Sequence, residues 1–261
     1  MEQLFQPQVP GTQAVERGAQ LLLGVLESDR PVSVTDLARA TELPKSTASR
    51  LLAVLARHGL VAQDGPRGLL RPGPAILAHA GRGLYERTLA ELARPSLAAL
   101  VAAADETVNL AVPGVGGVEH LAQLDGRHFL GTGQWIGRRV DYHTSAVGKV
   151  FLAYGAAVLP DGPLTPAGPA AILERGELGR ELLAIARAGH AVAIDELEAG
   201  LAAVAVPVRG ARGEVVAALA ISGPTLRLGP EEIARLLPKL KVEAQRLSCR
   251  LTDTDEGEHA A

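Results

Sequence analysis

The sequence predicts an α+β fold in which an N-terminal winged helix-turn-helix domain is joined by a linker helix to a larger α/β domain. Three helical patterns and a short hairpin pattern follow one another within about sixty residues, the size of a small winged helix module. Residues 74–104 then look helical almost throughout, with weak punctuation at Gly81, Gly83 and Pro95, and we expect a linker helix followed by the first helix of the second domain. In the remainder, strand pairs at both ends are separated by helices, unlike a regularly alternating βαβ fold. The predicted parts are a flexible arm (1–11), a winged helix-turn-helix domain (12–73), a linker helix (74–88), a second domain (89–252) and a disordered tail (253–261).

The composition excludes several classes of protein. Hydrophobic residues make up 47% of the chain and charged residues 21%, which excludes wholesale disorder. Cys249 is the only cysteine, so no intrachain disulfide can form and a reducing compartment is expected. The acidic N-terminus lacks the apolar run of a secretory signal, and no uninterrupted stretch of about eighteen apolar residues occurs. We therefore expect a cytoplasmic protein that does not enter a membrane.

The first two helices are predicted from spacing and capping. Apolar residues recur every three or four positions from Thr12 to Leu26, which is the pattern of an amphipathic helix. Ser33 then suits an N-cap, with Asp36 in the first turn of a short second helix.

The third helix and the hairpin complete the predicted module. The helix begins near Lys45, after a break at 41–44, and runs to His58, and Gly59 stands where a left-handed C-cap is expected. Residues 60–62 and 68–71 then form two short strand patterns around a turn.

The second domain alternates strand pairs with helices. Its predicted elements are strands at 107–112 and 118–123, an extended segment at 137–142, a helix capped by Thr144 or Ser145 and ending near Tyr154, a loop at 160–169, a helix at 170–188, strands at 202–208 and 214–221, and a last helix from Pro230.

Positive charge is concentrated in the predicted third helix and hairpin. Residues 43–73 hold five cations and one anion, although the chain as a whole has a net charge of −3. A cationic patch on a mildly acidic protein favours one surface that contacts phosphate.

The third helix has the residue types of a DNA recognition helix. Small hydroxyl residues allow close approach to base edges, Arg50 suits bidentate pairing with guanine, and Lys45 can reach guanine or phosphate. Arg67, at a glycine-flanked hairpin tip, suits a minor-groove or backbone contact. The predicted DNA contacts are Ser33, Thr35, Lys45, Ser46, Thr47, Ser49, Arg50 and Arg67.

Two alternatives remain open at this point. Hydroxyl residues at a helix start are often caps, and scattered arginines often mark a solvated face. Winged helices also serve as protein–protein or RNA adaptors, and the fold alone does not decide between these functions.

Several separated motifs resemble the IclR family of bacterial transcription regulators. Residues 37–52 are similar to the family run Leu-Ala-x-x-Thr-Gly-Leu-Pro-Lys-Ser-Thr-x-x-Arg-Leu-Leu, with Glu42 where the family often has glycine. The similarity continues in the same order to residue 250. Its further landmarks are His143-Thr-Ser-Ala-Val-Gly-Lys149, Glu196-Leu-Glu-Ala-Gly200, Val206-Pro-Val208 and Ile221-Ser-Gly-Pro224.

The resemblance implies the fold and the partners of the second domain. This domain is expected to be GAF-like and to bind a small organic acid or aromatic compound. The resemblance also implies a homodimer through the DNA-binding domains, or a homotetramer that includes the second domains. A dimer fits a palindromic double-stranded operator, because one recognition helix reads too few base pairs for specificity.

Residues of the second domain suggest how an effector is held. The amides at the start of the helix after Thr144 can bind a carboxylate without a cationic side chain, and Ser222 can add a hydroxyl. Trp135, the only tryptophan, suits a pocket wall, although plain packing is an open alternative. The predicted effector contacts are Trp135, Ser145, Ala146, Val147, Leu201 and Ser222.

Three alanines favour an apolar pocket. Some carboxylate-binding relatives have an acidic residue, a cysteine and a serine where this chain has Ala193, Ala203 and Ala220. Fewer polar groups favour an effector that is larger or more apolar than an oxoacid of two or three carbons.

The sequence carries no enzyme motif. It lacks a Gly-x-Ser-x-Gly elbow, a phosphate loop and a Cys-x-x-Cys pair. We therefore expect no catalysis, no cofactor and no metal, although a zinc site built from His120, His143 and His190 is an alternative that the sequence leaves open.

Overall fold

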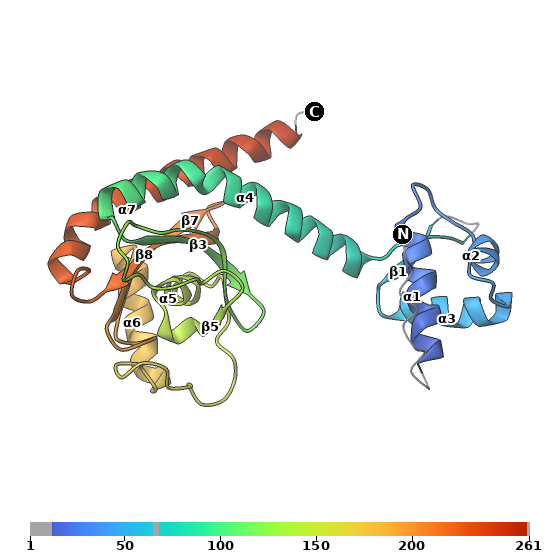
Figure 1. The fold of residues 1–261 in the computed structure, drawn as a ribbon, viewed down its shortest axis with the longest axis horizontal. Coiled ribbons are helices and arrows are strands. Elements are labelled where there is room, and N and C mark those ends of the chain that lie inside the picture. The colour runs from blue at the N-terminus through green and yellow to red at the C-terminus, as the bar shows by residue number, and fades with distance from the viewer. Residues whose placement is uncertain (1–11, 65–67, 260–261) are drawn as a thin grey trace. The chain divides into compact units, whose positions relative to one another are not determined.

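The computed structural model describes residues 12–64 and 68–259 of the chain (Figure 1). Two compact units divide between Tyr85 and Glu86. The predicted arm at 1–11 and the predicted DNA contact Arg67 lie outside the described residues.

The first unit is a three-helix module with a two-stranded antiparallel hairpin, which confirms the predicted helix-turn-helix and wing. Ser33 caps the second helix, since its Oγ accepts a hydrogen bond of 3.1 Å from the backbone N–H of Asp36. The elements are α1 (Gln13–Leu26), α2 (Val34–Ala40), α3 (Lys45–Arg57), β1 (Val61–Asp64) and β2 (Leu69–Pro72). The core contains Leu21, Val25, Leu37, Ala38, Ala48, Leu52, Val61 and Leu70.

The turn between α2 and α3 contains a strained residue. Glu42 has a φ of 54°, in the left-handed region that a glycine adopts without steric cost. This φ explains why the similar family run often has glycine at this position.

Helix α4 (Pro74–Ala104) is one continuous helix of 31 residues. We expected a linker helix at 74–88 followed by a separate helix, whereas Gly81, Gly83 and Pro95 all lie inside α4. A glycine costs a helix only about 1 kcal/mol and does not end it. Around Pro95, the burial of Ala93, Leu97 and Leu100 supplies packing energy that compensates for the lost backbone hydrogen bond.

The second unit contains a six-stranded sheet in the order β5-β4-β3-β8-β7-β6, with every neighbouring pair antiparallel. The strands are β3 (Thr107–Gly114), β4 (Gly117–Leu124), β5 (Arg139–Val140), β6 (Ala191–Ile194), β7 (Leu201–Arg209) and β8 (Val215–Pro224). The helices besides α4 are the 3-10 turn η1 (Tyr142–Thr144), α5 (Ala146–Ala153), α6 (Arg175–Ala188) and α7 (Pro230–His259).

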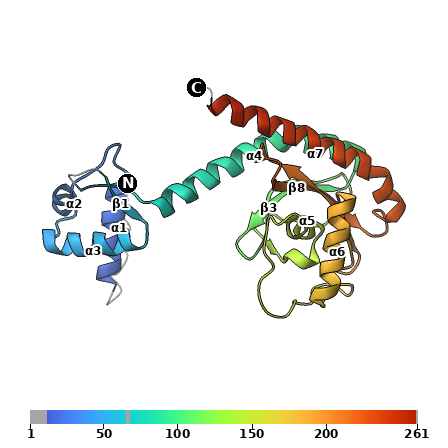
Figure 2. The same ribbon diagram turned by 180° about the vertical axis from the view of Figure 1, so that it is seen from behind.

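Helices cover both faces of this sheet. The second half of α4 and the long α7 lie on one face, and α5 and α6 lie on the other, as Figures 1 and 2 show. Each face has its own apolar core, built around Leu97 and Leu236 on the first face and around Val150 and Phe151 on the second.

Three elements besides α4 differ from the prediction. The short strand β6 was not predicted, because a four-residue run gives little periodicity, and it depends on pairing with β7. Helix α6 begins at Arg175, five residues later than expected. The tail was expected to be disordered from Asp253, whereas α7 continues to His259, because an existing helix extends at little further cost.

Within residues 12–64 and 68–259, no helix is both long and apolar enough to cross a lipid bilayer.

Candidate functional site

The start of α3 presents cations and hydroxyls to solvent. Ala48 and Leu52 are buried in the core of the first unit and fix the inward face of the helix. The other side chains from Lys45 to Arg50 are exposed or partly exposed, and the first turn has no acidic residue. The exposed or partly exposed side chains that were predicted as DNA contacts are Lys45, Ser46, Thr47, Ser49 and Arg50.

The two predicted DNA contacts at the start of α2, Ser33 and Thr35, differ in their hydrogen bonding and exposure. The hydroxyl of Ser33 donates to Asp36 Oδ2 at 2.7 Å while it also caps the helix, so this side chain is already engaged. Thr35 is exposed in the first turn of α2.

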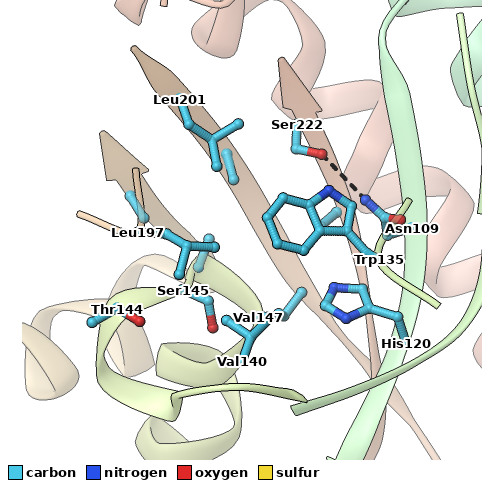
Figure 3. A pocket seen from close by; sticks show the side chains of 14 residues that line it. Asn109, His120, Trp135, Val140, Thr144, Ser145, Val147, Leu197, Leu201 and Ser222 are labelled. Atoms are coloured by element: carbon cyan, nitrogen blue, oxygen red, sulfur yellow. Dashed lines mark hydrogen bonds between the residues drawn. The ribbon is translucent and has the colours of Figure 1, made fainter. Parts of the chain in front are cut away.

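A pocket lies in the second unit, between the sheet and the start of α5 (Figure 3). All six predicted effector contacts line it, which are Trp135, Ser145, Ala146, Val147, Leu201 and Ser222. Its empty volume is about 470 Å³, a figure that includes open solvent at its mouth.

The alternation of the strands explains which residues reach the pocket. Successive side chains of a strand point to opposite faces of a sheet. On β3, Val108 and Leu110 enter the core beneath α4 and α7, so Asn109 faces the pocket. On β8, Leu219 and Ile221 likewise enter that core. The residues that face the pocket from β6, β7 and β8 include Ala193, Leu201, Ala203, Ala220 and Ser222.

One side of the pocket is the N-terminus of α5. Ser145 caps this helix, and its Oγ accepts a hydrogen bond of 3.1 Å from the backbone N–H of Gly148. The preceding amides of the helix, at Ala146 and Val147, have no acceptor within the helix. Together with the positive end of the helix dipole, these amides can bind an anionic group.

The polar groups on the opposite side come from β3, β4 and β8. The Nδ2 of Asn109 donates to Ser222 Oγ at 3.2 Å. The Oδ1 of Asn109 and the Nδ1 of His120 are buried and have no hydrogen-bond partner among the described residues. Burial lowers the pKa of His120 from 6.5 to about 4, so its imidazole is neutral at pH 7.

Trp135 is held in place beside these groups. Its indole Nε1 donates to Thr132 Oγ1 at 3.0 Å, and its backbone N–H donates to Gln123 Oε1 at 2.9 Å. The ring centroids of Trp135 and His120 are 6.0 Å apart. The indole therefore forms a fixed apolar wall of the pocket.

A buried ion pair supports α5 behind the pocket. Lys149 is fully buried, and its Nζ donates to Glu196 Oε1 at 2.6 Å and to Glu181 Oε1 at 2.8 Å. Burial raises the pKa of Glu196, although Lys149 acts in the opposite direction. This pair joins α5 to the segment that contributes Leu197 to the pocket wall.

Sequence reasoning missed several lining residues, namely Asn109, His120, Val140, Thr144 and Leu197. Asn109 had a visible signal, because it is the polar residue inside the apolar run Val-Asn-Leu-Ala of a strand. His120 was considered only as a zinc ligand. In the part of the chain that the structure describes, no three residues of the types His, Cys, Asp and Glu gather at metal-binding distance.

Comparisons with known proteins match both units. The family model described as "Bacterial transcriptional regulator IclR C-terminal" matches residues 82–249, and the model described as "IclR helix-turn-helix domain" matches residues 14–65. The pocket and α3 therefore lie in segments that have separate family matches.

Individual relatives match over nearly the whole chain. The HTH-type transcriptional regulator BhcR of Paracoccus denitrificans is 26% identical over 264 residues, which cover 96% of this chain and 91% of BhcR. The HTH-type transcriptional regulator XynR of Escherichia coli is 29% identical over 246 residues, which cover 92% of this chain and 97% of XynR.

A similar solved structure contains a ligand. It is an IclR homolog from Microbacterium hydrocarbonoxydans complexed with 4-hydroxybenzoate, and it is 26% identical with a TM-score of 0.59. The match covers 92% of this chain and 99% of that chain.

Proposed function

The chain belongs to the IclR family of bacterial transcriptional regulators, and from this premise we propose which of its surfaces bind DNA and effector. It is a DNA-binding transcription regulator controlled by a small molecule, and its family is not enzymatic.

The proposed DNA-binding surface is the start of α3. The observation that carries this proposal is the outward direction of its hydroxyl and cationic side chains, while Ala48 and Leu52 anchor the opposite face. Arg50 pairs with a guanine, and Lys45 contacts guanine or phosphate. The small residues between them allow the helix to enter the major groove, where its N-terminal amides face a phosphate.

The proposed assembly is a homodimer or homotetramer on a palindromic operator in the cytoplasm. One α3 contacts only a few base pairs, whereas two copies related by a two-fold axis read two half-sites about one helical turn apart. The matched relatives are transcriptional regulators, which favours this role over that of a protein or RNA adaptor.

The proposed effector is an organic acid with an apolar body. Its carboxylate binds the amides at Ala146 and Val147, and its body lies against Trp135 and the alanines of β6, β7 and β8. Because these alanines add no polar group, the pocket favours an acid larger than glyoxylate or pyruvate. An aromatic acid is bound by the homolog from Microbacterium hydrocarbonoxydans, which supports this class.

Fluorescence of Trp135 tests the effector proposal, because it is the only tryptophan and it lines the pocket. Titration with glyoxylate, pyruvate and benzoates is expected to change the emission at the lowest concentration for the benzoates. Tight binding of glyoxylate or pyruvate would contradict the proposed size of the ligand.

A further inference from the structure

We infer that Asn109 and His120 select an acid that carries a hydroxyl group at the end opposite its carboxylate. This inference rests on the proposed function, in which the pocket binds an organic acid through the start of α5. Asn109 and His120 would give the pocket a selectivity for a hydroxyl group, which apolar side chains cannot provide.

Two buried polar atoms of residues that line the pocket lack hydrogen-bond partners among the described residues. Asn109 is 2% exposed and His120 is 9% exposed, and both line the pocket. Neither Oδ1 of Asn109 nor Nδ1 of His120 has a hydrogen-bond partner among the described residues. Buried polar atoms are nearly always paired, because an unpaired one has lost its hydrogen bonds to water without replacing them and costs stability. A ligand group at this place would remove that cost.

The two side chains lie on the same face of neighbouring strands. His120 on β4 is opposite Ala111 on β3, and Asn109 is two residues before Ala111, so both point from the sheet into the pocket. Figure 3 shows Asn109 and His120 on one side of the pocket and Ser145 on the other. An acid bound at α5 therefore directs its far end toward Asn109 and His120.

The hydrogen-bonding capacity of the two groups specifies the ligand group. The Nδ2 of Asn109 is engaged by Ser222, and a carbonyl oxygen only accepts, so the ligand must donate to Oδ1. His120 is buried and neutral, so one of its ring nitrogens donates while the other accepts.

A hydroxyl fits these requirements better than its alternatives. It can donate to Asn109 Oδ1 and simultaneously accept from an N–H of His120. A methoxy group cannot donate. An ammonium group cannot accept, and no residue among those that line the pocket is acidic, so its charge would be buried without a counterion.

Matched acids provide the test. Binding of benzoate, 3- and 4-hydroxybenzoate and the corresponding methoxybenzoates is measured on the intact protein by calorimetry, together with hexanoate and 6-hydroxyhexanoate. In at least one of these series, the hydroxy acid is expected to bind roughly tenfold tighter than the acid without the hydroxyl, the value of one buried hydrogen bond. Methoxybenzoates are expected to bind no tighter than benzoate.

Substitutions test whether Asn109 and His120 cause the preference for the hydroxy acid. Asn109→Leu is expected to reduce the preference to within about threefold, and His120→Phe is expected to reduce it partly. Thr107→Val is the matched control, because Thr107 lies two residues before Asn109 on β3 but is not among the residues that line the pocket, and its hydroxyl already donates to Asp125 Oδ1. This control should keep the full preference, and circular dichroism verifies that each variant is folded.

The outcomes separate this inference from the proposed function. Equal binding of hydroxy, methoxy and unsubstituted acids would overturn the inference and leave the acid pocket intact. A preference that survives Asn109→Leu would also overturn it. If no acid of either series binds, the proposed pocket function fails and the inference fails with it.

Discussion

The Nζ of Lys149 lies 2.6 Å from Oε1 of Glu196, and both side chains are buried behind the ligand pocket. Glu181 lies 2.8 Å from the same Nζ, so two carboxylates share one ammonium group. The contact with Glu196 connects α5, whose first amides are the proposed carboxylate site, with the segment that contributes Leu197 to the pocket wall. The geometry of the pocket therefore depends on a buried charge.

Replacement of this lysine tests that dependence. Lys149→Met leaves Glu196 buried without its cation, so the free energy of unfolding is expected to fall by about 3 kcal/mol or more. Urea unfolding followed by the fluorescence of Trp135 reports on the second unit alone, because Trp135 is the only tryptophan. Glu196→Gln is the control: it should cost less than half as much, since Lys149 keeps Glu181. A loss below about 1 kcal/mol for Lys149→Met would contradict the structural role.

Arg50→Ala tests the recognition helix. If Arg50 reads a guanine, the substitution should weaken operator binding by roughly 1–3 kcal/mol and relax selectivity at one base pair. Fluorescence anisotropy with a set of single-base operator variants measures both effects. Arg187→Ala removes one exposed arginine from α6 and serves as a control for net charge. A uniform loss over all sequences would instead identify Arg50 as a phosphate contact.

The burial of His120 predicts a pH dependence of stability. Its pKa falls from 6.5 to about 4 in the folded protein, so below pH 6.5 the unfolded chain binds a proton that the folded protein does not bind. Stability is therefore lost as the pH falls from 6.5 to 4, by at most roughly 3 kcal/mol. His120→Gln should flatten this part of the unfolding profile, whereas His128→Gln, at a side chain that is 44% exposed, should keep it. Identical profiles for His120→Gln and the unchanged protein would contradict the neutral, buried imidazole.

Replacement of Glu42 by glycine is expected to stabilise the first unit. Its φ of 54° costs a residue with a Cβ about 1–2 kcal/mol, and this cost exceeds the extra entropy that a glycine loses on folding. Glu42→Gly should therefore raise the free energy of unfolding of the first unit by about 0.5 kcal/mol or more, as measured by circular dichroism. A clear destabilisation would show that the Glu42 side chain makes a compensating contact.

Much of the fold could be predicted from the sequence, because local sequence patterns indicate where many of its elements begin and end. The cap at Ser33 was identified from residue type and position, and the cap of α5 was narrowed to Thr144 or Ser145; Ser33 and Ser145 accept the expected backbone hydrogen bonds. Strand β6 and the continuity of α4 could not be predicted, because both depend on pairing and packing with residues far away in the sequence.

The candidate site was predicted to a similar extent. The start of α5 and the alanines were identified from motifs, and the structure places them around one pocket. Asn109 and His120 were missed as pocket residues, because a single polar residue in a strand does not show which face it occupies until the register is known.

The most direct test of the account is the affinity of the protein for the promoter DNA beside its own coding sequence, measured over a range of salt concentrations with and without a pocket ligand. If α3 binds DNA and the pocket controls this binding, log K falls linearly with log salt, at about 0.9 for each phosphate that is neutralised, and the ligand shifts the affinity at every salt concentration. A weak salt dependence with no preference for this duplex, or an affinity that no pocket ligand changes, would contradict it.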